Sequence, residues 1–303
     1  MRHFLNMITI ALLCLLSGCI RQKLEDCPPL RIRLEVKDKN YFNIDQVETL
    51  TELDHRVDEN LSFSSYVDRL YYALYRRGET EPCLVQHLYE PHEEASTHEL
   101  LFPQELPFGD YQLVVWGNID TEKGIEYDGL PHTYRLHGEH QEGYDVYMGS
   151  ISLVYNERSA DHVLPLERVK GKLLIEVVDM PGEVSKSHKE VDHLYEQVNA
   201  QWQYTGSGEV LTEERWKKGI HNIMTDTYLS PTDEQTDSQV RVTFVPGEET
   251  QPPLPQPAAA KIRMKRNEIT VLRYVYDADT DGFDIYLLIN DGWTLIHDMD
   301  IEE

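Results

Sequence analysis

The sequence is dominated by short runs in which apolar and charged residues alternate, and this pattern restricts the chain to a fold built from strands. LRIRLEV at residues 30–36 alternates Leu, Ile and Val with charged residues, and RVKGKLLIEVVDMP at 168–181 does so again. A repeat of two residues is that of a strand with one buried face, whereas an amphipathic helix repeats every 3.6 residues. Both runs are therefore predicted strands.

Further strand candidates are separated by Gly, Pro and Asp-Gly turns. They lie in 66–78, 99–102, 106–118, 144–155, 161–167, 239–246 and 267–301. The segment 38–62 is acidic and weakly patterned, so we expect a long loop with at most a short helix. LTEERWKKG at 211–219 offers the best helix start, with Thr212 as the cap. Many short strands without alternating helices predict an all-β pair of sandwiches.

The length of 303 residues suggests two domains, and 40% hydrophobic residues are enough for two cores. We expect an N-terminal β-sandwich over 30–165 and a C-terminal β-sandwich over 166–303. The formal charge of -26 argues against a nucleic-acid partner, because KIRMKR at 261–266 is one short basic run in an acidic chain.

The N-terminus has the features of a secretory signal peptide over residues 1–18. A basic start precedes an apolar run from Phe4 to Leu16, which is shorter than the roughly 20 residues of a membrane-spanning helix. This length disfavours a retained, uncleaved anchor. An ordinary signal peptide with a chance cysteine behind it is the other alternative.

The end of this signal, Leu16-Ser17-Gly18-Cys19, resembles the bacterial lipobox. Small residues before the cut give the signal peptidase access to the backbone, and the Cys19 thiol is the nucleophile that takes a diacylglyceryl group. We expect residues 19–29 to be a lipidated tether, held in the bilayer by acyl chains such as palmitate. Each buried methylene contributes about 0.8 kcal/mol, and stable anchoring takes more than one chain.

The segment KLED at 23–26 looks like the export tag of lipoproteins on the outer face of the outer membrane; the alternative is a solvated tether. Cys14 leaves with the signal, which leaves Cys27 and Cys83 in an oxidising compartment. Two such thiols favour a disulfide, and two separate buried thiols are the alternative.

No residue pattern selects an enzyme or a metal site, and we expect no catalytic residue and no cofactor. DADTDGFD at 277–284 opens like a calcium loop, but its twelfth position is Leu288, so a hairpin turn at 281–282 is favoured. The histidine clusters at 92–99 and 137–140 lack the spacing of a zinc motif and are interpreted as solvated loops.

Four tryptophans raise a competing hypothesis, that of a surface glycan-binding lipoprotein of a nutrient-uptake system. Such rings could form a sugar-stacking platform if they were exposed on one face, although they more often fill sandwich cores. They are Trp116, Trp202, Trp216 and Trp293. A lipid-anchored hydrolase is a further alternative, which would need a cleft with convergent acids or a nucleophile with its base.

Several short motifs together resemble the FimB-type fimbrillin-associated anchor proteins of Bacteroidetes. DCPP at 26–29 follows Cys19 closely, and LPFGDYQLVVWGN at 106–118 resembles that family's Leu-Pro-x-Gly-x-Tyr strand ending in Trp-Gly. The family's second domain often opens with Arg-x-x-(Gly/Ala)-x-(Leu/Ile). This chain has Arg168, Gly171 and Leu173 at those positions.

The resemblance implies two tandem transthyretin-like, Greek-key β-sandwiches and a role as anchor or accessory subunit of a fimbria. It implies fimbrillin-like subunits as partners, bound through sheet edges, and the outer-membrane bilayer as the partner of the acyl chains. A Cys27–Cys83 bridge would favour the anchor role. Major fimbrillins are cut after an arginine, and Arg21 and Arg56 leave anchor and shaft subunit both open.

Overall fold

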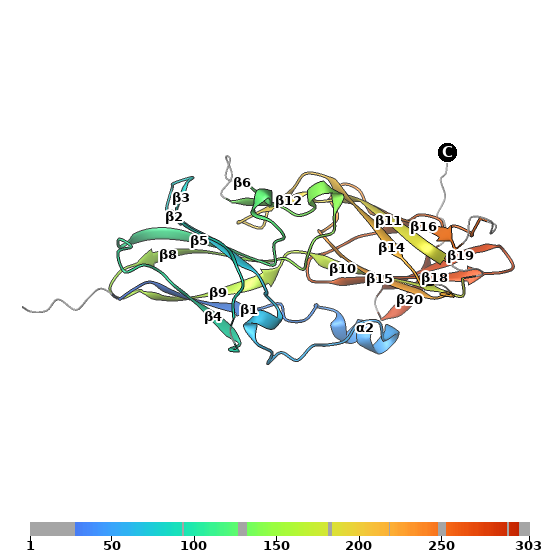
Figure 1. Cartoon of the computed structure of the whole chain (residues 1–303), viewed down its shortest axis with the longest axis horizontal. Helices are drawn as coiled ribbons and strands as arrows, with labels where there is room; N and C mark the ends of the chain where they lie inside the picture. Colours follow the sequence, from blue (N-terminus) through green and yellow to red (C-terminus); the bar gives the residue numbers. More distant parts are fainter. Residues whose placement is uncertain are drawn as a thin grey trace, which may run out of the picture.

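The computed structural model describes residues 28–92, 94–126, 132–180, 184–217, 219–247, 253–289 and 291–296. Figure 1 shows an elongated molecule, with the blue-to-green strands at one end and the yellow-to-red strands at the other. Within the described ranges there is one α-helix, α2 (Ile44–Thr51), and strands make up most of the regular structure. The predicted all-β sandwich architecture is confirmed.

The first sandwich is formed by one seven-stranded sheet that curls around a core. Its order is β3-β2-β5-β8-β9-β1-β4. The strands are β1 (Arg31–Val36), β2 (Leu70–Arg76), β3 (Pro82–Tyr89), β4 (Thr97–Leu101), β5 (Gly109–Gly117), β8 (Tyr147–Tyr155) and β9 (Asp161–Arg168). β8 and β9 are paired at only two positions, so the sheet can fold over between them. Residues from both halves of the sheet then face one core.

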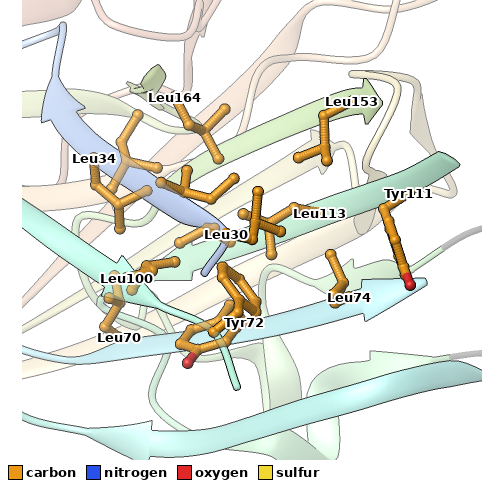
Figure 2. Packing of buried hydrophobic residues seen from close by; sticks show 14 of the residues in the cluster. Leu30, Leu34, Leu70, Tyr72, Leu74, Leu100, Tyr111, Leu113, Leu153 and Leu164 are labelled. Atoms are coloured by element: carbon orange, nitrogen blue, oxygen red, sulfur yellow. The ribbon is translucent and has the colours of Figure 1, made fainter. Parts of the chain in front are cut away.

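Figure 2 shows that core as leucines and tyrosines from the facing strands. The labelled residues are Leu30, Leu34, Leu70, Tyr72, Leu74, Leu100, Tyr111, Leu113, Leu153 and Leu164. The alternation that predicted β1 is visible here, because its apolar residues are buried and its arginines exposed. β1 runs parallel to β9 and antiparallel to β4.

The second sandwich packs two sheets face to face. The five-stranded sheet has the order β15-β10-β18-β19-β20, and the four-stranded sheet has the order β14-β11-β16-β17. The first contains β15 (Ile223–Leu229), β10 (Gly171–Val178), β18 (Ile269–Asp277), β19 (Gly282–Ile289) and β20 (Gly292–Ile296). The second contains β14 (Gly208–Arg215), β11 (Val184–Leu194), β16 (Ser238–Pro246) and β17 (Ala260–Ile262).

Two further elements connect the sandwiches. A small sheet pairs β12 (Gln197–Asn199) and β13 (Tyr204–Thr205) with β7 (Thr133–Arg135) and β6 (Ile125–Glu126). Helix α2 lies between β1 and β2 of the first sandwich in the sequence but packs on the second, against Leu174, Ile269 and Val271 (Figure 1). The 3-10 turns are η1 (Phe63–Ser65), η2 (Glu122–Gly124) and η3 (Gly138–His140).

The predicted boundary between residues 165 and 166 lies inside β9, and the division into two domains stays a prediction. The loop expected over 38–62 contains only the short helix α2, as expected. The helix expected at 211–219 is wrong, because β14 continues to Arg215 and pairs with β11. Pairing across the sheet outweighs the local capping signal of Thr212.

Candidate functional site: the junction and the sheet edges

The residues predicted for lipid attachment lie outside the described part of the chain. These are Cys19 and the peptidase recognition residues Leu16, Ser17 and Gly18. Cys27, which was predicted to form a disulfide, also lies outside the described part. Lipidation at Cys19 therefore stays a prediction. No helix in the described ranges has the length and hydrophobicity needed to cross a bilayer.

Cys83 lies on β3 at an exposed position, where its thiol donates to the Leu74 carbonyl oxygen at 3.3 Å. Burial of the sulfur raises the pKa of the Cys83 thiol. It is a free thiol among the described residues, which do not include Cys27. The predicted Cys27–Cys83 bridge stays a prediction.

Arg168 lies at the centre of the junction between the sandwiches and is almost completely buried, at 4% exposed. Nε lies 2.9 Å from both Asp145 oxygens, and the other two nitrogens donate to Asn267 Oδ1 at 2.7 Å and to the Tyr147 hydroxyl at 2.6 Å. The Tyr41 ring covers the guanidinium, 4.0 Å from its centroid. Arg168, at the end of β9, thereby links Asp145 and Tyr147 near the start of β8 to Asn267, just before β18 of the second sandwich.

Electrostatics explain why this charge can be buried. Burial opposes the charge on Arg168, but Asp145 and Tyr147 more than offset that effect and raise the pKa of the guanidinium above its usual value. A buried ion pair is maintained when its remaining donors find partners, as they do here.

Gly171 and Leu173 complete the motif that begins at Arg168. A Cβ at Gly171 would stand 2.2 Å from the Lys265 carbonyl oxygen and 2.9 Å from that of Glu268, so no side chain fits there. Leu173 is fully buried in the second core. The contacts of each residue therefore explain why the Arg-x-x-Gly-x-Leu pattern has arginine, glycine and leucine at these positions.

The junction also contains two buried groups that the sequence did not reveal. Lys170 is 1% exposed, donates to the Glu142 carbonyl oxygen at 2.5 Å, and has its pKa lowered by burial to about 8. His137 accepts from the Ser230 amide at 3.0 Å and donates from Nδ1 to the Gln141 carbonyl oxygen, so its ring is neutral. Burial lowers the pKa of His137 well below its usual value.

The interpretation of both histidine clusters as solvated loops is wrong at their key residues. His137 is 5% exposed, and His98 lies on β4, 8% exposed and 2.8 Å from the Tyr89 hydroxyl. Ser230, one partner of His137, lies 93 residues away in the sequence, and only the fold brings the two together.

A cavity of about 450 Å³ lies beside Arg168, between the segment 39–66 and the two sandwiches. Its charged side chains mostly pair with one another: Arg168 with Asp145, and Lys172 with Asp54 at 3.0 Å. The lining also includes five tyrosines: Tyr41, Tyr66, Tyr144, Tyr147 and Tyr228. The groups around this cavity hold the junction together.

The acidic run at 277–284 forms the predicted hairpin turn, with Asp277 opposite Gly282 between β18 and β19. Asp277 accepts hydrogen bonds from the Asp279 amide and the Thr280 hydroxyl, and Asp281 accepts one from Tyr276. In the described ranges, no three His, Cys, Asp or Glu residues are placed to hold a metal ion.

The tryptophans do not gather on one exposed face. Trp116 is fully buried, and the other three are half-buried. Trp202 stacks with Arg266 at 4.6 Å, Trp293 stacks with Arg273 at 4.2 Å, and Trp216 donates to the Ser187 hydroxyl. This distribution does not supply the platform that the glycan-binding hypothesis needs.

Two sheet edges are capped by side chains. The Leu88 amide on the edge strand β3 donates to Glu122 Oε1 at 2.7 Å, while Glu122 Oε2 binds His87. On β16, the Gln256 side chain accepts from the Phe244 amide at 2.7 Å and donates to its carbonyl oxygen at 2.9 Å. Such caps prevent another chain from pairing at these positions.

Several sheet edges are open in the described ranges, among them those of β4, β14 and β15. The Phe102 amide bonds to the Leu30 carbonyl, so the backbone of its neighbour Leu101 faces outward on β4. The Lys172 amide donates to the Glu268 carbonyl oxygen, on the β18 side of β10. Tyr228, which is opposite Lys172 in the β10–β15 register, therefore turns its backbone groups away from β10, toward the open side of β15. Unpaired backbone groups on such edges can accept a strand from another chain.

The family of fimbrillin-A associated anchor proteins Mfa1 and Mfa2 has a model that matches residues 24–298. Among curated proteins, none matches the chain.

Solved structures share the fold at low sequence identity. A candidate adhesin from Bacteroides ovatus is 12% identical with a TM-score of 0.57, covering 93% of this chain and 98% of its own. A candidate adhesin from Bacteroides thetaiotaomicron is 11% identical with a TM-score of 0.55, covering 90% and 100%. The fimbrial anchor protein Mfa2 from Porphyromonas gingivalis is 12% identical with a TM-score of 0.51, covering 89% and 100%.

Proposed function

Since the chain belongs to the family of fimbrillin-A associated anchor proteins, we propose that it is a non-enzymatic lipoprotein that anchors a fimbria at the outer membrane. The observation that carries this proposal is the family match, which extends over both sandwiches. Acyl chains on Cys19 hold the protein in the membrane, and the sandwiches carry the fimbrial partner at the cell surface.

Sheet edges supply the means of binding a subunit. An extended segment that pairs with an edge gains backbone hydrogen bonds, and its alternate side chains set register and specificity. An open edge can supply such a site, whereas Glu122 and Gln256 close two other positions. The junction around Arg168 also supports the anchor role. A protein that tethers a fimbria must transmit force, and the buried contacts of this junction keep the two sandwiches from separating.

The test is deletion of the gene followed by electron microscopy of whole cells and of the culture medium. We expect fimbriae to be shed into the medium or altered in length, because the shaft has lost its attachment. A deletion strain that keeps unaltered, firmly attached fimbriae would contradict the anchor role.

A further inference from the structure

A hollow of about 630 Å³ lies at the side of the second sandwich, where the open edge of β14 meets β15 and the loop before β8. β14 contributes four consecutive residues, Leu211–Glu214, whereas β15 contributes only Asp226. Figure 1 shows β14 and β15 on the neighbouring sheets of this sandwich. The loop before β8 contributes residues 141–144, so the hollow lies between that loop and the β14 edge.

Register determines which backbone groups of β14 face this side. The Trp216 amide bonds to the Ser185 carbonyl on β11 at 2.8 Å, so every second residue before Trp216 also bonds to β11. The residues between them, Leu211, Glu213 and Arg215, turn their amides and carbonyls outward. Within the described ranges no protein group bonds to these outward groups.

Negative charge surrounds this edge. Glu142, Glu214 and Asp226 all line the hollow. Burial, together with repulsion from Asp226, raises the pKa of both Glu142 and Glu214. Two buried lysines lie nearby: Lys189 Nζ lies 4.0 Å from Glu214 and donates to the Thr225 hydroxyl, and Lys170 donates to the Glu142 carbonyl oxygen.

The other neighbouring charges are already paired. Lys186 and Arg215 lie 3.3 Å and 3.6 Å from Glu213, and Lys172 lies between Asp54 and Asp226. Leu211, half-exposed at 49%, adds an apolar contact to the same hollow. Five carboxylates and no lysine or arginine are among the described residues that line the hollow. An edge with outward backbone groups and a leucine beside such a hollow suits an extended basic peptide.

We propose that the free edge of β14 accepts an extended segment of the fimbrial partner, carrying lysine or arginine, as an added strand. The partner's backbone pairs with Leu211, Glu213 and Arg215, and its cations meet Glu142, Glu214 and Asp226. This assignment rests on the proposed function and names the surface that carries it out.

The test uses proline at Leu211, because the Leu211 amide faces away from β11 and its loss leaves the sheet intact. The matched control is Leu101→Pro on β4, where the leucine is also exposed and its amide also faces outward. Each variant is expressed as the full chain in the native cell, beside the deletion strain. We expect Leu211→Pro cells to shed about ten times more fimbriae than wild type, and Leu101→Pro cells to retain them.

A second pair of variants keeps the backbone unchanged. Leu211→Lys repels a basic segment and should shed fimbriae, whereas Leu211→Glu should retain them. Thermal unfolding of the purified proteins identifies any variant that fails to fold.

If the deletion strain sheds fimbriae while Leu211→Pro and Leu211→Lys both retain them, the β14 assignment is wrong and the anchor role stands. If Leu211→Lys and Leu211→Glu behave alike, the basic character of the partner is wrong. If the deletion strain itself retains its fimbriae, both proposals fail.

Discussion

Arg168 and Asp145 form an ion pair inside the junction, with Nε 2.9 Å from each carboxylate oxygen and both side chains largely shielded from water. Arg168→Met leaves the Asp145 carboxylate buried without its partner. We expect the free energy of unfolding to fall by about 3–5 kcal/mol, the usual effect of breaking a buried pair. Urea unfolding followed by far-UV circular dichroism measures it.

The control is Arg263→Met, which removes an exposed pair with Asp237, 57% exposed on the arginine side. Its effect should stay within about 1 kcal/mol, because water screens exposed pairs. Equal losses for the two variants would show that the junction does not depend on Arg168.

Gly171→Ala tests the close backbone approach at the start of β10. A methyl group would meet two carbonyl oxygens that belong to the backbone and cannot rotate away. We expect a loss of at least about 2 kcal/mol in urea unfolding, at the upper end of overpacking effects. Gly292→Ala meets nothing within 4 Å and should leave stability unchanged or slightly raised. A neutral Gly171→Ala would mean that the strand ends are free to separate.

The outcome for these motif residues shows what the sequence could predict. Alternation predicted β1 and β10 because each has one face buried in a core, a property of the strand itself. Arg168, Gly171 and Leu173 could be selected by their resemblance to a family pattern, but not by their contacts. Asn267 and Tyr41, which bind or cover Arg168, lie far from it in sequence.

Other features depended entirely on tertiary pairing. The helix expected near Thr212 became β14 because β11 offered a complete ladder of partners. The burial of His137 depends on Ser230, which lies 93 residues away. The edge caps Glu122 and Gln256 resemble any other polar residue until the edge beside them is known.

Lys170 predicts an unusual dependence of stability on pH. Burial lowers the pKa of its amine from 10.5 to about 8, so between these values the folded protein holds the amine neutral while the unfolded chain binds a proton. The free energy of unfolding should therefore rise with pH across this window, by about 3 kcal/mol in total for Lys170 alone. Burial raises the pKa of tyrosines such as Tyr204. Above pH 10 these buried tyrosines therefore lower the free energy of unfolding as the pH rises, opposite to the effect of Lys170.

Urea unfolding of wild type and Lys170→Met, from about pH 7.5 to about pH 9.5, isolates this contribution. The wild type should gain stability relative to Lys170→Met as the pH rises. Lys261→Met, at an exposed position on β17, is the control and should keep the wild-type slope. Parallel curves for wild type and Lys170→Met would contradict the buried, neutral amine.

The predicted Cys27–Cys83 bridge can be tested by alkylation. The described chain begins at Pro28, whose carbonyl oxygen accepts a hydrogen bond from the Tyr155 hydroxyl at 2.9 Å, and Cys83 lies exposed on β3 of the same sandwich. We expect the two cysteines to resist alkylation until the protein is reduced, and Cys83→Ser to lose about 4 kcal/mol. Two thiols that react in the native, unreduced protein would rule the bridge out.

Cys19→Ser tests the attachment on which the anchor role depends. Several acyl chains at residue 19 would each bury many methylenes, at about 0.8 kcal/mol apiece, whereas serine takes no thioether-linked lipid. We expect the variant to lose labelling by radioactive palmitate and to leave the membrane fraction, taking the fimbriae with it. Cys14→Ser changes a cysteine inside the predicted signal peptide and should be labelled and retained like wild type. A Cys19→Ser protein that stays in the membrane would require an attachment other than lipid at this residue.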